Sequence, residues 1–151
     1  MFMKNNAIHY ITKVMVDIMF YGGILACIAL PFVLPLLMTL IGVSMRYQMA
    51  YTIILLSAGM CAVYIVYQLK YMLKTLLGGN PFVIQNVSCL RKCGVASALI
   101  AVIFLIRLFL WFTIAASIIA AIFSMLSLFS LTIKDLFKQA VAYKEETDWT
   151  V

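Results

Sequence analysis

The stretch that decides the fold is residues 94–133, GVASALIAVIFLIRLFLWFTIAASIIAAIFSMLSLFSLTI, whose 40 residues include a single charge, Arg107. As one helix it would measure about 60 Å, twice the hydrocarbon core of a bilayer, which is about 30 Å thick. The stretch must therefore fold back on itself as two membrane spans. We place the turn near residues 111–113, because Trp111 suits a membrane interface and Arg107 can extend its charge outward.

Two further apolar runs precede this stretch. No charged residue occurs between Ile18 and Met45, or between Tyr47 and Leu69. Pro31 and Pro35 remove backbone donors from the outer half of the first run, so we expect a bend or an early end there. The sequence predicts one all-α domain over residues 1–151, an integral membrane four-helix bundle. Its approximate spans are 18–40, 47–69, 94–110 and 114–133, with a cytoplasmic loop 70–93 and a cytoplasmic tail 134–151.

Composition supports a lipid environment. Hydrophobic residues make up 66% of the chain and charged residues only 11%. A soluble domain of 151 residues has too little interior to bury so much apolar surface. The first run is too long for a signal peptide and no small-residue cleavage site follows it, so we expect it to be retained as a helix.

The distribution of basic residues predicts the orientation. With both termini in the cytoplasm, nine of the eleven Lys and Arg residues lie inside and only Arg46 and Arg107 lie outside. This bias follows the positive-inside rule and predicts a multi-pass protein of the inner (cytoplasmic) membrane. The net charge of +6 does not indicate nucleic-acid binding, because the basic residues stand at the ends of apolar runs and not on one face.

The connection between the second and third spans carries the clearest local signals. Gly78 and Gly79 favour the C-terminal end of a helix, and Asn80 followed by Pro81 is typical of a new N-cap and first helical position. Residues 81–93 would then form either a short interfacial helix or the cytoplasmic beginning of the third span.

Catalytic and metal-binding patterns are not found in the sequence. The chain has one histidine and five carboxylates, and none stands in a metal-binding or paired arrangement. We therefore expect no enzyme activity, no cofactor and no metal. Cys89 and Cys93, four residues apart, are expected to be reduced, with a redox or metal-responsive pair as the alternative. Asp17 is expected either to pair locally with Lys13, four residues before it, or to extend its carboxylate to the inner interface.

Two features bear on association. Small residues recur four apart, as in Ser57 with Cys61, Ala116 with Ala120, and Ser117 with Ala121; they predict close helix packing, inside the bundle or in a homodimer. Residues 144–151 hold three of the five acidic residues and end in an apolar, β-prone triplet. They form either a solvated tail or a docking segment that adds to a partner.

Two short motifs resemble an uncharacterised family of small bacterial membrane proteins, the domain of unknown function 2975 family. One is the series Gly79-Asn80-Pro81-Phe82, Asn86, Leu90-Arg91 and Gly94, and the other is the ending Glu146, Asp148, Thr150, Val151. Trp149 stands where the family usually has Leu, and Cys93 where it often has an aliphatic residue. The resemblance implies four spans and a gene often next to a small helix-turn-helix regulator, but no established reaction.

These features predict a noncatalytic membrane regulator or adaptor. Residues 79–94 and 145–151 would form one cytoplasmic platform for a protein partner, with a helix-turn-helix transcription regulator as the partner that the resemblance suggests. The alternative is a transport or immunity component that packs against another membrane protein, supported by the Pro31–Pro35 helix. The predicted partner-binding residues are Asn80, Pro81, Phe82, Asn86, Leu90, Arg91, Gly94, Glu146, Asp148, Trp149, Thr150 and Val151.

Overall fold

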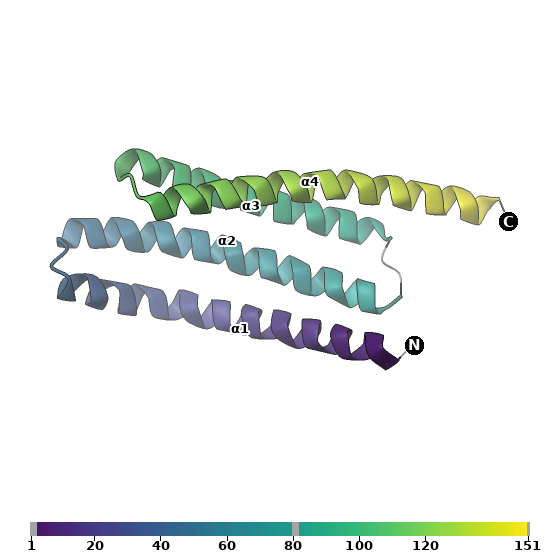
Figure 1. Ribbon diagram of the computed structural model, residues 1–151, viewed down its shortest axis with the longest axis horizontal. Helices are drawn as coiled ribbons and strands as arrows, with labels where there is room; N and C mark the ends of the chain where they lie inside the picture. The colour runs from purple at the N-terminus through teal and green to yellow at the C-terminus, as the bar shows by residue number, and fades with distance from the viewer. Residues whose placement is uncertain (1–2, 80–81, 151) are drawn as a thin grey trace.

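The protein consists of four long helices joined by short connections (Figure 1). The structure is a computed structural model that describes residues 3–79 and 82–150. Its helices are α1 (Met3–Leu40), α2 (Met45–Leu77), α3 (Ile84–Leu110) and α4 (Ile114–Trp149), and no strand occurs in these ranges. Each is long and apolar enough to cross a membrane. The prediction of an all-α chain with four such helices is confirmed.

The junction of α2 and α3 differs in part from the prediction. α2 ends where the glycines predict, with Gly78 as its C-cap and Gly79 at φ +83°. α3, however, begins at Ile84 with Val83 as its N-cap, three residues later than the start expected at Pro81. Asn80 and Pro81 themselves lie outside the described residues. Residues 84–93 form the first part of α3, so they are not a separate interfacial helix.

The turn between α3 and α4 lies at residues 111–113, the same residues at which we expected the chain to fold back. Trp111 packs against α2, with its ring centroid 5.0 Å from that of Tyr47 and 5.7 Å from that of Tyr51. The Arg107 guanidinium carbon lies 5.0 Å from the centre of the Tyr51 ring, a cation–π distance. The turn is therefore fixed by aromatic packing, which explains why it needs no Gly or Pro.

The helices are arranged as an open row. Close backbone approaches join α1 to α2, α2 to α3 and α3 to α4, and no other pair within the described ranges. A closed bundle would also bring α4 against α1, so the predicted bundle is correct in its helices but not closed. With four antiparallel helices, both ends of the chain lie at the same end of the molecule (Figure 1).

The best-packed part of the molecule lies between α3 and its neighbours. Ser97 and Ala116 are fully buried, and Ile100 is 1% exposed. Gly94 lies at a close approach of α3 and α4, and the Ser127 hydroxyl donates a hydrogen bond to its carbonyl oxygen at 2.8 Å. Of the predicted small-residue pairs, Ala116 with Ala120 faces this core, whereas Ala121 is exposed. Small side chains permit this approach, as expected of helices in lipid.

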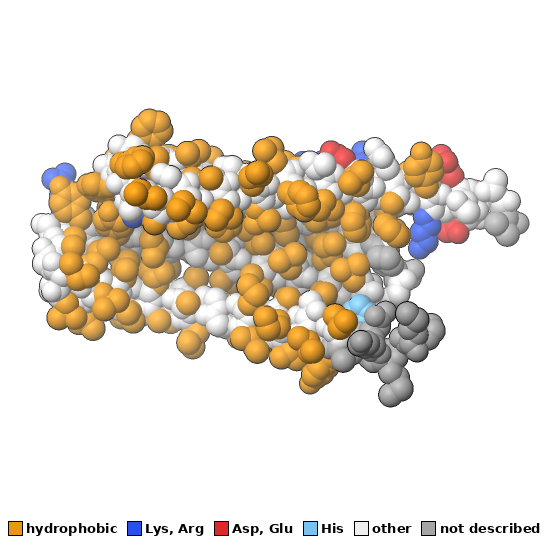
Figure 2. Space-filling view, in the orientation of Figure 1, with side chains coloured by type: hydrophobic (Ala, Val, Ile, Leu, Met, Phe, Trp, Pro, Cys, Tyr) orange, Lys and Arg blue, Asp and Glu red, His pale blue; other side chains and the backbone are white. Residues whose placement is uncertain are grey.

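The outer surface suits a lipid environment. Figure 2 shows hydrophobic side chains over the length of the visible face, with the charged side chains mainly in the half that carries the termini. Many of the largest apolar side chains point outward, for example Phe109 at 94% and Phe32 at 76% exposure. In lipid such side chains need no protein partner.

Candidate partner-binding site

The structure brings together the beginning of α3 and the last turns of α4. One shallow hollow of about 390 Å³ is lined by residues 82–85 and by Val141, Lys144, Glu145 and Asp148 of α4. Beside it the rings of Phe82 and Phe137 are in contact, with centroids 5.6 Å apart. We call these lining residues, together with Phe137 and Trp149, the corner surface. It unites part of the predicted loop with part of the predicted tail, although about 55 residues separate them in the chain.

The α4 part of the corner surface is helical as far as Trp149. It extends beyond the start of α3, so its last turns stand clear of the other helices (Figure 1). A helix uses its own backbone groups, which leaves no strand edge to which a partner could add. Recognition at this segment must therefore use side chains, including Trp149, which is 90% exposed.

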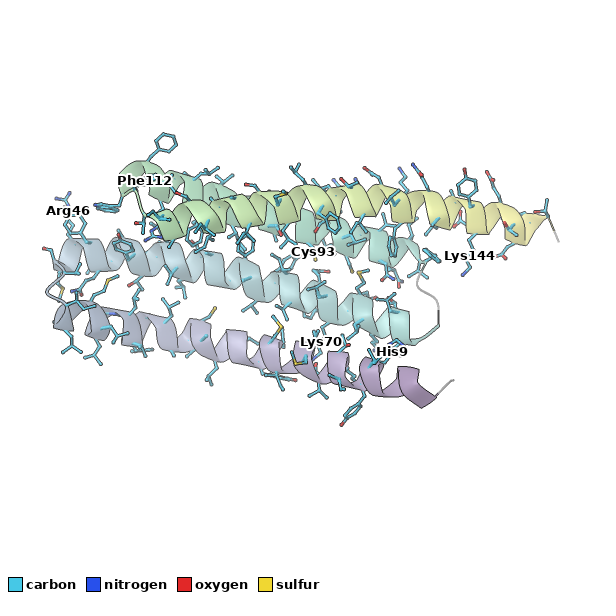
Figure 3. The ribbon with its side chains drawn as sticks, viewed as in Figure 1. His9, Arg46, Lys70, Cys93, Phe112 and Lys144 are labelled. Atoms are coloured by element: carbon cyan, nitrogen blue, oxygen red, sulfur yellow. The ribbon has the colours of Figure 1, made fainter. Side chains whose placement is uncertain are left out.

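The acidic residues of α4 are divided between two faces of the helix. Glu145 and Asp148 stand three residues apart, share a face and both line the hollow, together with Lys144. Glu146 is exposed but does not line it. Figure 3 shows Lys144 at this projecting end of α4. The hollow thus combines an apolar rim from α3 with two carboxylates from α4.

Several motif residues that we expected to contact a partner are buried instead. Asn86 is fully buried, and its Oδ1 accepts a hydrogen bond from the Thr75 hydroxyl at 2.6 Å. Leu90 is 8% exposed, and Gly94 lies against Leu131 of α4. These three residues hold α2, α3 and α4 together, so in this structure they offer a partner no surface.

The remaining predicted residues fall into three groups. Phe82, Glu146, Asp148, Trp149 and Thr150 are exposed at or next to the corner surface. Arg91 is exposed too, but it lines a different hollow between α2 and α3. Asn80, Pro81 and Val151 lie outside the described residues. About half of the predicted set therefore shares one surface.

Asp17 forms an interhelical ion pair that the sequence analysis missed. Its Oδ1 lies 2.8 Å from the Nζ of Lys70 on α2, and not against Lys13 as expected. The same Nζ lies 5.1 Å from the ring centres of Phe20 and Tyr21. Figure 3 shows Lys70 between α1 and α2. The sequence did contain a signal for this pair: Asp17 directly precedes the first apolar run and Lys70 directly follows the second, so two antiparallel helices would bring them to the same level.

The cysteines are all free thiols, and the pair on α3 faces the protein interior. Cys89 and Cys93 are 4% and 6% exposed, and the Cys93 Sγ lies 3.9 Å from the carbonyl oxygen of Ile65 on α2. A redox-responsive thiol needs access to its oxidant, so this burial does not favour the redox alternative. Within residues 3–79 and 82–150, no group of three His, Cys, Asp or Glu side chains is placed to hold a metal.

The side chains at the corner surface are of kinds that can bind another molecule. They are apolar, amide, carboxylate and ammonium groups on two helices. Such a surface recognises another molecule by shape and charge. Comparisons with family models, curated proteins and solved structures found no match to this chain, so its function must be inferred from its own residues.

Proposed function

We propose that this chain is a noncatalytic regulator or adaptor of the inner (cytoplasmic) membrane whose corner surface binds a cytoplasmic protein. One observation carries the proposal: exposed apolar and acidic side chains from two distant segments meet at the end of the molecule where α4 projects past its neighbours. The four spans would anchor the surface, and the projecting helix would present it.

The cytoplasmic location of both termini is part of this proposal. The two termini lie at one end of the row (Figure 1), and nine of the eleven basic residues belong to that end or to the segments leading to it. Positive charge is retained on the cytoplasmic side of membrane proteins. The corner surface, which lies at the same end, then faces the cytoplasm.

The chemistry of the corner surface favours a basic partner with an apolar contact patch. Glu145 and Asp148 supply negative charge, and Phe82 and Trp149 supply exposed aromatic surface. A small helix-turn-helix regulator has this character, because its DNA-contacting face is basic. Binding at the membrane would keep such a regulator from DNA, in line with the family resemblance.

The test is affinity purification of the full-length protein in mild detergent, followed by mass spectrometry. We expect the chain to recover a small basic DNA-binding protein, and the Glu145→Gln/Asp148→Asn variant to lose it at least tenfold. Glu146→Gln is the matched control, because it removes a charge next to Glu145 without touching the hollow. Equal recovery by all three forms would refute the role of the corner surface.

One observation favours the alternative of a transport or immunity component. α1 packs on α2 alone within the described ranges, so its other faces are open to lipid or to a second membrane protein. In that case the purification would recover another membrane protein, and the changes at Glu145 and Asp148 would not affect it.

A further inference from the structure

A row of large side chains on α2 remains open between α1 and α3. Met60, Tyr64, Tyr67 and Tyr71 follow a spacing of four, three and four residues, which places them on one helical face. α1 and α3 both pack on α2 but not on each other within the described residues. The face between them is therefore uncovered by protein.

The hollows on this face adjoin one another. Met60 and Tyr64 line both a hollow of about 400 Å³ toward α1 and one of about 470 Å³ toward α3. Tyr67 and Tyr71 line both a hollow of about 350 Å³ toward α1 and one of about 240 Å³ toward α3. The four hollows share these residues as common walls and adjoin one another along α2, and we call the surface that they form the tyrosine groove.

One end of the tyrosine groove is strongly basic. Asp17 is the only acidic side chain that lines the hollows in the described part of the chain, and Lys70 pairs with it. Four more cations line the hollows: Lys13 and Lys74 stand beside α1 at this end, Lys92 stands beside α3 at the same end, and Arg91 lies next to Lys92 in the hollow that continues to Met60. The excess positive charge therefore lies at the end of the groove near the termini.

The other end is apolar. Ile24 and Ile28 of α1 and Val95 and Leu99 of α3 form its walls. Met60 stands eleven residues before Tyr71 on α2, so this end lies about 16 Å along the helix from the basic end. The groove thus runs from charged to apolar in the direction of the bilayer interior.

We propose that the tyrosine groove binds an anionic phospholipid. The phosphate lies among Lys13, Lys74, Arg91 and Lys92 with the tyrosine hydroxyls as further donors, and an acyl chain follows the apolar floor toward Met60. Basic pockets between membrane helices bind such headgroups. A free phosphate would use only the basic end, whereas a lipid matches the whole groove. This site is separate from the corner surface and does not depend on a protein partner.

The proposal can be tested by native mass spectrometry of the full-length protein in detergent, titrated with phosphatidylglycerol, phosphatidylcholine or inorganic phosphate. We expect phosphatidylglycerol to bind at least tenfold more tightly than the other two. A lysine near an anionic lipid raises the binding affinity by about a factor of five. Loss of two lysines in Lys74→Ala/Lys92→Ala should therefore weaken phosphatidylglycerol binding about thirtyfold. Lys134→Ala/Lys138→Ala removes the same charge from α4, outside the groove, and should change binding less than twofold.

A second pair of variants tests the acyl-chain part. Met60→Trp fills the apolar floor and should weaken phosphatidylglycerol binding about tenfold, whereas Met125→Trp, at a site 74% exposed on α4, should not. Circular dichroism melting shows which variants fold, and Lys13→Ala/Arg91→Ala replaces the first double variant if that one does not. An equal loss of phosphatidylglycerol affinity in Lys74→Ala/Lys92→Ala and in Lys134→Ala/Lys138→Ala would indicate nonspecific charge attraction and overturn the proposal. Tight binding of inorganic phosphate, unaffected by Met60→Trp, would overturn it too.

Discussion

The two helical hairpins of this molecule are built differently. In the α3–α4 hairpin, ten residues of α3 and five of α4 are buried. In the α1–α2 hairpin, no residue of α1 is buried between Ile8 and Leu40, although this helix is equally apolar. Apolar character alone therefore does not bring helices together in lipid.

The difference lies in side-chain size. The α3–α4 interface is made by small residues, such as Gly94, Ala116 and Ala120, with a hydrogen bond from Ser127. The α1–α2 interface has two tight points, Gly23 against Val63 and Gly59 against Cys27, one ion pair, and a hydrogen bond from the Gln48 amide to the Thr39 hydroxyl. Lipid solvates large apolar side chains as well as protein does, so close approach through small residues determines which helices are packed tightly.

The largest loss of stability is expected when a side chain is added at the close contact between α3 and α4. A Cβ at Gly94 would lie 3.0 Å from the Leu131 side chain and 3.4 Å from the Ser127 carbonyl oxygen. Gly94→Leu should therefore lower the free energy of unfolding by about 3 kcal/mol, since α4 cannot yield without losing its hydrogen bond. Reversible unfolding in mixed detergent micelles, followed by circular dichroism, measures this change.

Gly22→Leu is the matched control for this change. No atom lies within 4 Å of a Cβ built at Gly22, so the new side chain extends into lipid. Its unfolding free energy should stay within about 0.5 kcal/mol of the parent protein. A loss as large as that of Gly94→Leu would show that glycine itself, and not the close approach, matters in these helices.

A smaller loss of stability is expected from the same substitution at Gly59, which lies at a close contact between α1 and α2. A Cβ at Gly59 would lie 3.0 Å from the Cys27 Sγ, the same shortest distance as at Gly94. Because the neighbour at Gly59 is the end of the Cys27 side chain and, in the described part of the chain, no hydrogen bond like that of Ser127 holds α1 at this point, α1 can shift outward, and Gly59→Leu should cost only about 1 kcal/mol. The unfolding measurement in mixed micelles tests this value. A loss of unfolding free energy equal to that of Gly94→Leu would mean that α1 is held as firmly as α4.

The smallest effect is expected from the ion pair that joins α1 to α2. Its two side chains are 38% and 32% exposed, and partly exposed pairs contribute less than about 1 kcal/mol. Asp17→Asn should lower the unfolding free energy by no more than this amount. The charge-exchanged variant Asp17→Lys/Lys70→Asp should recover part of the loss, and failure to recover any would argue against a direct pair.

The helices could be predicted from the sequence, and their pairing could not. Runs free of charge and about 20 residues long define spans without any knowledge of tertiary contacts, and Gly78 with Gly79 marks a helix end through local backbone geometry. The open order of the row depends on which faces meet. Large apolar residues on α1 and small residues on α3 have the same hydropathy signal, so the sequence predicted a four-helix bundle but not the order in which its helices pack.

The candidate site was predictable only in part, for a related reason. The position of Phe82 near the end of α4 follows from the antiparallel arrangement of α3 and α4 once the turn at 111–113 is placed. Asn86 and Gly94, in contrast, were assigned to a partner because they belong to the motif that resembles the family. In the structure Asn86 accepts a hydrogen bond from the Thr75 hydroxyl and Gly94 lies at a close helix contact, and short motifs do not distinguish such roles from binding.

The open row also bears on how the molecule is made. Within the described residues, the close backbone approaches join only helices that are consecutive in the chain, so α2 can pack on α1 as soon as it enters the membrane, and α3 and α4 can follow in turn. No step has to wait for the last helix to find the first one. Low contact order of this kind favours rapid assembly during synthesis. It also leaves each intermediate without a gap that a later helix must fill.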